Sequence, residues 1–164
     1  MKKLFIAALM GCASVAAAAA DTENTYVGVS VGSSEYNIDG DKQHHTGVGL
    51  AFGQSIAENV GYEIGYAHLG KADAGGTVQA LYLAGVGKYA FGQGFDVHGK
   101  IGPTINYYSA HGDTGSDTYV RLLLSAGVGY QFDKNWSASL DYTNFGKSAG
   151  VTPSLWSVGV QYHY

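Results

Sequence analysis

The sequence is poor in charge, cysteine and proline. Only 13% of its 164 residues are Asp, Glu, Lys or Arg, about half the usual share of a globular protein. The formal net charge of −4 gives no reason to expect nucleic acid as a partner. The single cysteine, Cys12, rules out an internal disulfide framework. With only two prolines and 25 glycines, the composition allows either a β-sandwich or a β-barrel.

Long apolar runs are also missing after residue 20. No later stretch of about 18 apolar residues exists, so we expect no membrane-crossing helix. The mean hydropathy of −0.03 would on its own suit an ordinary soluble protein. Any membrane insertion must therefore be sought in a pattern of alternating residues and not in a run.

The first twenty residues have the pattern of a secretory signal peptide. Two lysines open the chain, an apolar stretch follows, and small residues continue to position 20. Cleavage after Ala20 would make Asp21 the N-terminus and would place Ala18 and Ala20 at the small positions of the cleavage site. We therefore predict a signal peptide over residues 1–20 and a single domain over residues 21–164.

Two alternatives to simple cleavage remain open. Residues 4–20 could act as a short membrane anchor, and the letters LMGC resemble a lipoprotein signal that ends at Cys12. Under the favoured cleavage Cys12 is discarded. The exported domain would then be stabilised without cross-links, in a compartment where disulfides persist.

Apolar and small residues alternate along almost every segment of the domain. Near the C-terminus Trp156, Val158 and Val160 alternate with Ser157 and Gly159, and such a period of two predicts β-strands. We expect eight strands, joined in turn by tight turns and longer polar connections. The turns lie at 55–59, 91–94 and 133–135, and the connections at 36–45, 70–76, 111–117 and 146–152. The faces of segment 77–90 are ambiguous, and we expect Tyr82, Ala84 and Val86 on its apolar side.

The face opposite the apolar one decides the architecture. It is mostly Gly, Ser and Ala, which is too poor in charge for a surface in water. The narrow interior of an eight-stranded barrel, however, fits small side chains and a few paired polar groups. Tilted strands of about 9–11 residues cross a bilayer, and closure leaves no unpaired edge. We predict an all-β fold, an eight-stranded antiparallel up-and-down transmembrane β-barrel, with a secreted lipocalin-like barrel as the alternative.

Aromatic residues lie toward both ends of the predicted strands. Two aromatic girdles are expected where a barrel meets the two membrane–water boundaries. Toward the turns lie Phe52, Tyr62, Phe95, Tyr130, Phe132, Trp136, Tyr162 and Tyr164, and toward the loops lie Tyr66, Tyr82, Tyr107 and Trp156.

These features together resemble the small outer-membrane β-barrels of the OmpA transmembrane domain and OmpX type. The sharpest match is at the C-terminus, where Ser157, Gly159, Tyr162 and Tyr164 fit the family's assembly signal of polar-x-Gly-x-x-aromatic-x-aromatic. The resemblance implies insertion by the outer-membrane assembly machinery of a Gram-negative bacterium. It also implies a monomer without a cofactor, surrounded by lipid and lipopolysaccharide, with its loops outside the cell. A chain that ends with the barrel is expected to be closer to OmpX than to full-length OmpA.

Five charged residues occupy inward positions of the predicted strands: Glu63, Asp96, Lys100, Arg121 and Asp141. A buried charge needs a partner. At about 2.5 Å of climb per residue, Lys100 and Asp141 both lie about 13 Å above the turn side, and Glu63 lies at about 8 Å. We predict a Lys100–Asp141–Glu63 cluster that plugs the lumen. The alternative is that lumen water solvates each charge separately.

Arg121 is expected much higher, about 28 Å above the turn side. It should sit at the loop-side rim, within reach of Asp113 or Asp117. By resemblance to OmpA, an internal charge network implies a closed or barely conducting lumen, and eight strands leave little room for a nutrient channel.

The resemblance favours a non-enzymatic surface barrel with an envelope-structural role, or a role in adhesion through contact with host surface molecules. Lipid A-modifying enzymes such as PagP and PagL share the fold, and such chemistry needs a histidine beside a hydroxyl or carboxylate at the rim. Pro103 cannot donate to the strand ladder, so OmpW-like sideways passage of small hydrophobic molecules is a further alternative. The histidine candidates are His44, His45, His68 and His111, of which the first two could instead bind a metal with Asp39 and Asp41. We expect neither a catalytic nor a metal site.

Overall fold

The computed structural model describes residues 25–38, 41–71, 77–109, 116–147 and 152–164. None of these residues belongs to a helix long and apolar enough to cross a bilayer. The described residues form eight strands: β1 Thr25–Ile38, β2 Asp41–Ala57, β3 Val60–Lys71, β4 Thr77–Phe91, β5 Phe95–Ser109, β6 Ser116–Gln131, β7 Trp136–Asn144 and β8 Thr152–His163. The predicted signal peptide, with Ala18, Ala20 and Asp21, lies outside the described residues and stays a prediction.

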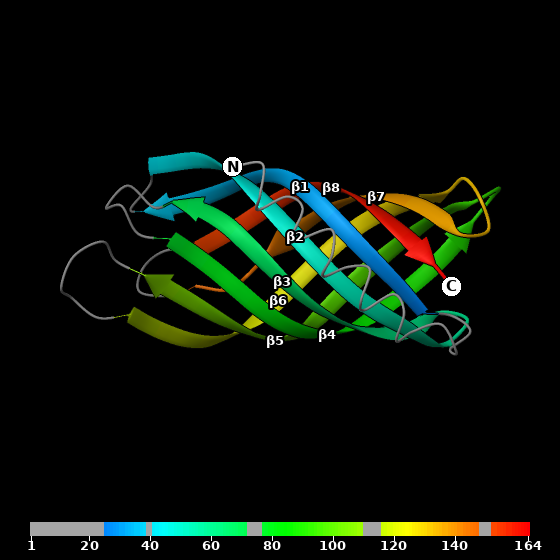
Figure 1. The fold of residues 1–164 in the computed structure, drawn as a ribbon, viewed down its shortest axis with the longest axis horizontal. Helices are drawn as coiled ribbons and strands as arrows, with labels where there is room; N and C mark the ends of the chain where they lie inside the picture. Colours follow the sequence, from blue (N-terminus) through cyan, green and yellow to red (C-terminus); the bar gives the residue numbers. More distant parts are fainter. Residues whose placement is uncertain (1–24, 39–40, 72–76, 110–115, 148–151) are drawn as a thin grey trace, which may run out of the picture.

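Each strand pairs antiparallel with its neighbour in the chain, and β8 closes the barrel against β1. Figure 1 shows the strands oblique to the long axis, with the short turns and the C-terminus at one end of the barrel. The eight-stranded antiparallel up-and-down barrel predicted from the alternation is confirmed.

The strands are tilted relative to the barrel axis. A row of paired residues followed once around the barrel does not return to the residue where it began. The row that begins at Thr25 returns to β1 at Glu35, ten residues nearer the loops. This offset corresponds to a tilt of about 40° from the barrel axis. The row runs Thr25, Gln54, Tyr62, Gly85, Ile101, Leu124, Asn144, Ser154 and Glu35.

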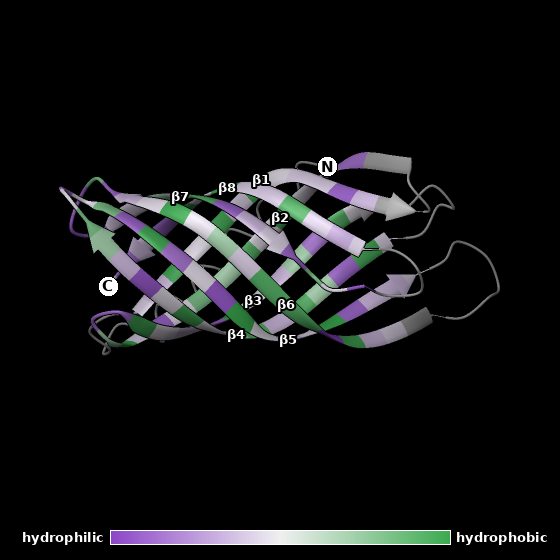
Figure 2. Ribbon diagram, turned by 180° about the vertical axis from the view of Figure 1, so that it is seen from behind, coloured by the Kyte–Doolittle hydropathy of each residue, from purple (hydrophilic) through white to green (hydrophobic). Residues whose placement is uncertain are grey.

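The polarity of the wall is inverted relative to a soluble barrel. On β8 the outward Trp156 and Val158 are 53% and 56% exposed, whereas Ser157 between them is 6% exposed. Figure 2 shows this alternation of apolar and polar positions along the strands. The apolar faces therefore point away from the lumen, as the alternation predicted.

The expected face of β4 was wrong. Tyr82, Ala84 and Val86 point into the barrel, and Leu81 and Leu83 face outward with 40% and 52% exposure. Both faces of this strand carry apolar residues, so the period of two could not distinguish them. Tyr82 also drops out of the loop-side girdle for this reason, because its hydroxyl binds inside the lumen.

The strands also extend beyond their predicted ends. The β1–β2 ladder continues to the pair Ile38 and Asp41, and the β5–β6 ladder continues to Ser109 and Ser116. Part of each predicted loop is thus strand, from 36–38 and 41–45 in the first to Thr152 in the last. These polar strand ends lack the apolar alternation that a membrane-embedded strand needs, which is why the sequence pattern did not reveal them.

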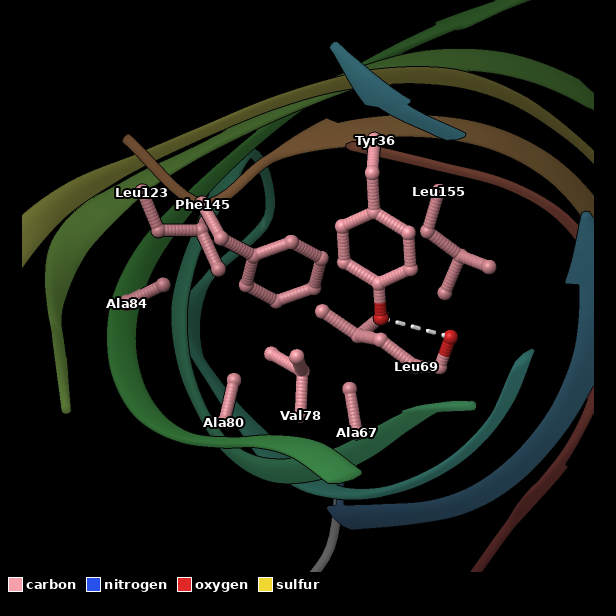
Figure 3. Packing of buried hydrophobic residues seen from close by; sticks show 9 residues of the cluster. All are labelled: Tyr36, Ala67, Leu69, Val78, Ala80, Ala84, Leu123, Phe145 and Leu155. Atoms are coloured by element: carbon pink, nitrogen blue, oxygen red, sulfur yellow. Dashed lines mark hydrogen bonds between the residues drawn. The ribbon is translucent and has the colours of Figure 1, made fainter. Parts of the chain in front are cut away.

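The loop-side half of the lumen is filled by bulky apolar side chains, although only small and ionised residues were expected inside. Figure 3 shows them converging from opposite walls, and the Tyr36 hydroxyl donates to the Leu69 carbonyl at 2.8 Å. We call this group the apolar seal. It consists of Tyr36, Ala67, Leu69, Val78, Ala80, Ala84, Leu123, Phe145 and Leu155.

Two inward glycines make room for two large rings in the turn-side half of the lumen. A Cβ built on Gly53 would lie 2.2 Å from the Tyr26 ring, and one on Gly65 would lie 2.3 Å from the Tyr82 ring. A side chain at either position would collide with a ring whose hydroxyl is held in place by Glu63. The two glycines are therefore required by close approach.

Gly65→Ala should destabilise the barrel because the new methyl displaces Tyr82. We expect a loss of about 1–3 kcal/mol in the free energy of unfolding, measured by urea titration in detergent micelles with gel mobility as the readout. Gly87→Ala is the matched control, because a Cβ on this outward glycine has nothing within 4 Å. Equal unfolding midpoints for the two variants would contradict the steric account.

Candidate functional site

A buried carboxylate links four strands in the turn-side half of the lumen. Glu63 on β3 is 0% exposed. Its Oε2 accepts a hydrogen bond from the Tyr26 hydroxyl of β1 at 2.7 Å, and its Oε1 accepts one from the Tyr82 hydroxyl of β4 at 2.8 Å. Lys100 of β5 lies 2.9 and 3.1 Å from the two oxygens. Each oxygen thus has a neutral and a charged donor, which offsets the cost of burying the charge.

The network continues from Lys100 to β7. The Lys100 ammonium lies 3.7 Å from Asp141 Oδ1. The same oxygen is 2.9 Å from His98 Nε2, while the Ser139 hydroxyl donates to Oδ2 at 2.7 Å. Asp141 is only 6% exposed, so its charge too depends on these donors.

His98 bridges two carboxylates. Its Nδ1 lies 2.9 Å from Asp96 Oδ1, and its Nε2 lies at the same distance from Asp141. Both nitrogens can donate only when the ring carries both protons, so the geometry fits an imidazolium cation. The network ends at Lys88, whose ammonium lies 3.9 Å from Asp96 at the turn-side mouth. Acidic and basic groups therefore alternate along the whole chain of contacts.

The structure thus brings Lys100, Glu63 and Asp141 together, and Asp96 joins them through His98. His98 was not among the five predicted residues because histidine was not counted as a charge. The alternation of β5 already put it on the inward face, between two inward charges. Tyr82 was missed because it was placed on the outward face of its strand and in the loop-side girdle, whereas Tyr26 was not assigned to either face.

Arg121 lies apart from this network. Its Nε donates to the Lys147 carbonyl at 2.6 Å, and Nη1 donates to the Val120 carbonyl at 2.9 Å. The guanidinium also sits 5.1 Å from the centre of the Tyr119 ring. Of the two expected partners, Asp113 lies outside the described residues and the side chain of Asp117 is not described.

The charge network separates two cavities. A vestibule of about 480 Å³ opens at the turn side and reaches Glu63, His98 and Lys100. A smaller cavity of about 50 Å³ lies beyond, lined by Lys100 and Asp141 on one side and by Leu123 and Phe145 of the apolar seal on the other. The lumen is therefore interrupted twice between the turns and the loops.

The three histidine candidates that lie among the described residues have different surroundings. His44 is exposed, the His45 ring lies 5.7 Å from the Tyr36 ring, and His68 lies opposite Gln79 in the β3–β4 ladder. Within the described ranges no three His, Cys, Asp or Glu side chains gather in a metal-binding arrangement. His111 and Asp39 lie outside those ranges, and the side chain of Asp41 is not described.

The wall stays closed at Pro103. The β4–β5 ladder skips the positions opposite Pro103 and Gly102 but resumes in the same register at Gly85 and Ile101. A Cβ on Gly102 would lie 2.0 Å from the Leu83 carbonyl oxygen, so the two backbones are in close contact. Proline removes a donor here without opening a gap.

The C-terminal assembly signal divides between the two faces of β8. Ser157 and Gly159 point inward and are buried. The Tyr162 ring packs outside against Trp136 and Tyr164, with centroids 5.0 and 5.1 Å apart. Recognition of these residues by the assembly machinery stays a prediction.

The sequence comparison agrees with this architecture. The family described as outer membrane protein beta-barrel domain matches residues 5–164. The chain belongs to this family. Outer membrane protein A of Yersinia pseudotuberculosis is 32% identical over 197 residues, covering 100% of this chain and 56% of that protein. The Serratia marcescens protein of the same name is 30% identical over 203 residues, with the same coverage, so the chain spans about half the length of the curated relatives it matches.

Solved outer-membrane barrels share the fold. Neisserial surface protein A superposes with a TM-score of 0.73 at 13% identity, covering 85% of this chain and 97% of that one. Ail, the attachment invasion locus protein of Yersinia pestis, gives 0.66 at 16% identity and covers 87% and 100%. The chain is an integral outer-membrane barrel of the small OmpA/OmpX-like class, a class in which short turns face the periplasm.

Lys100→Met should strongly destabilise this outer-membrane barrel, because it leaves Glu63 and Asp141 buried without their shared cation. We expect a loss of about 3–5 kcal/mol in the free energy of unfolding, measured by urea titration in detergent. Lys88→Met is the control at the exposed end of the same network and should cost under about 1 kcal/mol. An unchanged midpoint for Lys100→Met would show that the network does not hold the lumen together.

Proposed function

We propose that the chain is a non-enzymatic structural barrel of the outer membrane whose lumen does not conduct solutes. The observation that carries this proposal is the double interruption of the lumen. The charge network and the apolar seal are stacked along the axis, with a cavity of about 50 Å³ between them. The likeness to outer membrane protein A and to the attachment invasion locus protein Ail also supports a structural or surface role.

The two barriers oppose passage for different physical reasons. An ion that enters from the periplasmic vestibule meets a network whose charges are already mutually compensated, so no fixed charge is left to replace its hydration shell. Beyond it, the side chains around Tyr36 and Phe145 fill the lumen with apolar surface, and an apolar constriction excludes water. Removing either barrier alone leaves the other in place.

This arrangement predicts an unusual pattern of conductance in planar bilayers. The wild-type barrel should give no steady channel, and Lys100→Ala alone should also remain closed. A channel should appear when Lys100→Ala is combined with Tyr36→Ala and Phe145→Ala, since both barriers are then reduced. Steady conductance of the wild-type protein, or of Lys100→Ala at the level of the triple variant, would contradict a lumen closed in series.

A structural role should be visible in the cell envelope. A strain that lacks the chain should become more sensitive to detergent, and Lys100→Ala at wild-type abundance should restore resistance because transport is not required. Measured abundance in the outer membrane serves as the control for folding. Normal detergent resistance of the deletion strain would argue against an envelope role.

Adhesion to host surface molecules is the second candidate. Its support is the likeness to Ail, which has also been solved in complex with the heparin analogue sucrose octasulfate, together with hairpins whose ladders continue to Ile38–Asp41 and Ser109–Ser116. Such hairpins would present a firm surface outside the cell. The same deletion strain, scored for host-cell binding, separates the two roles, because a purely structural barrel leaves binding unchanged once the envelope is intact.

A further inference from the structure

The outward apolar surface is much taller on one side of the barrel than on the other. On β5 outward apolar or glycine positions run from Phe95 to Tyr107, a climb of about 30 Å. On β1, across the barrel, they run only from Val27 to Val31, about 10 Å. The next outward residue on β1 is Ser33, which is exposed.

Heights on different strands can be compared through the pairing register. The row of paired residues that starts at Thr25 returns to β1 at Glu35 after eight strands, ten residues nearer the loops. Residues at equal height on successive strands, counted from β1 to β8, therefore lie about one and a quarter residues per strand closer to the turns than the paired residues do. By this rule Ser33 on β1 lies level with Leu122 on β6. Leu122 is 54% exposed, and Val120 above it is 63% exposed. The first outward polar residue on β6 is Thr118, about 10 Å higher than Ser33.

The residues beside β1 follow the same low boundary. Thr46 and His44 on β2 are exposed polar residues above Val48. On β7 the outward residue above Tyr142 is Asn144. The loop-side edge of the apolar surface therefore slopes down from β5 and β6 toward β7, β8, β1 and β2.

A tilt of the whole barrel does not account for the slope. A tilted barrel would raise the turn-side edge wherever it raises the loop-side edge. The turn-side edge does not do so, since Phe95 on β5, Trp136 on β7 and Ile56 on β2 lie at similar heights and are 50%, 43% and 70% exposed. On β1 this edge begins at Val27, which by the same register lies higher than Phe95 and not lower. The apolar belt is thus a wedge, tall at β5–β6 and short at β1.

We propose that the barrel compresses the outer leaflet on one side, so that lipid headgroups descend along β7, β8, β1 and β2 to the level of Val31. The partner is the lipid itself. The outward polar side chains of Ser33, His44 and Thr46 supply hydroxyl and imidazole groups suited to the sugars and phosphates of an outer-leaflet headgroup. Local thinning of a bilayer around a protein has a modest cost, so a folded barrel can impose it. This inference rests on the outer-membrane location and not on the function proposed above.

Fluorescence quenching at matched heights tests the wedge. Ser33→Cys and Leu122→Cys, each in a Cys12→Ser background, are labelled with an environment-sensitive dye and reconstituted in phosphatidylcholine vesicles. Aqueous iodide should quench the dye at position 33 several-fold more than at 122. Phosphatidylcholine brominated in its acyl chains should give the reverse. Phe95→Cys and Trp136→Cys report the turn-side edge and should behave alike.

Three outcomes would overturn the proposal. Equal quenching at 33 and 122 would mean a belt of uniform height. A difference between 95 and 136 that matches the difference between 33 and 122 would mean a tilted barrel. A dye at 33 that both quenchers fail to reach, increasingly so at higher protein density, would mean that a second copy of the chain and not lipid covers β1. Unfolded variants are recognised by their gel mobility, and Thr46→Cys against Ile105→Cys is a second pair at matched height.

Discussion

The narrowness of an eight-stranded barrel governs the rest of this structure. Closure satisfies every strand edge by pairing, yet it leaves a lumen in which no charge can keep a full hydration shell. Glu63 meets this constraint with donors from three other strands. The charges of this network therefore compensate one another and are not isolated groups. The network joins opposite walls of the barrel.

The same constraint explains how the lumen is divided. Polar partners can be brought together only where the walls carry small residues, such as Gly53 and Gly65, that leave space for the tyrosine rings. Toward the loops the walls carry Leu69, Leu123 and Phe145, and close packing takes over from ion pairing. The result is a periplasmic vestibule that ends at the charge network, with the apolar seal beyond it. Neither the charge network nor the apolar seal can open without its side chains losing their partners, which is consistent with the structural role proposed above.

The outer face of the barrel wall contacts membrane hydrocarbon and not water. Hydrocarbon stabilises outward apolar side chains, so the height of the apolar belt on each strand indicates how far the hydrocarbon layer is expected to reach there. On β5 and β6 it is as tall as an ordinary bilayer core, and on β1 it is far shorter. The hairpins that continue above the belt no longer need an apolar face, which is why their sequence looks like loop while their backbone remains paired.

Alternation along the chain was enough to determine the strand count, the order of turns and loops, and the outward direction of the apolar faces on every strand except β4, because a period of two is a local property of a strand. It also placed Lys100, Asp141 and Glu63 at nearby heights. Tertiary structure alone decided what depends on contacts across the lumen. Whether Tyr82 faces lipid or Glu63, whether His98 bridges two carboxylates, and whether Phe145 meets Tyr36 are set by the register of strands distant in sequence. No single strand contains that information.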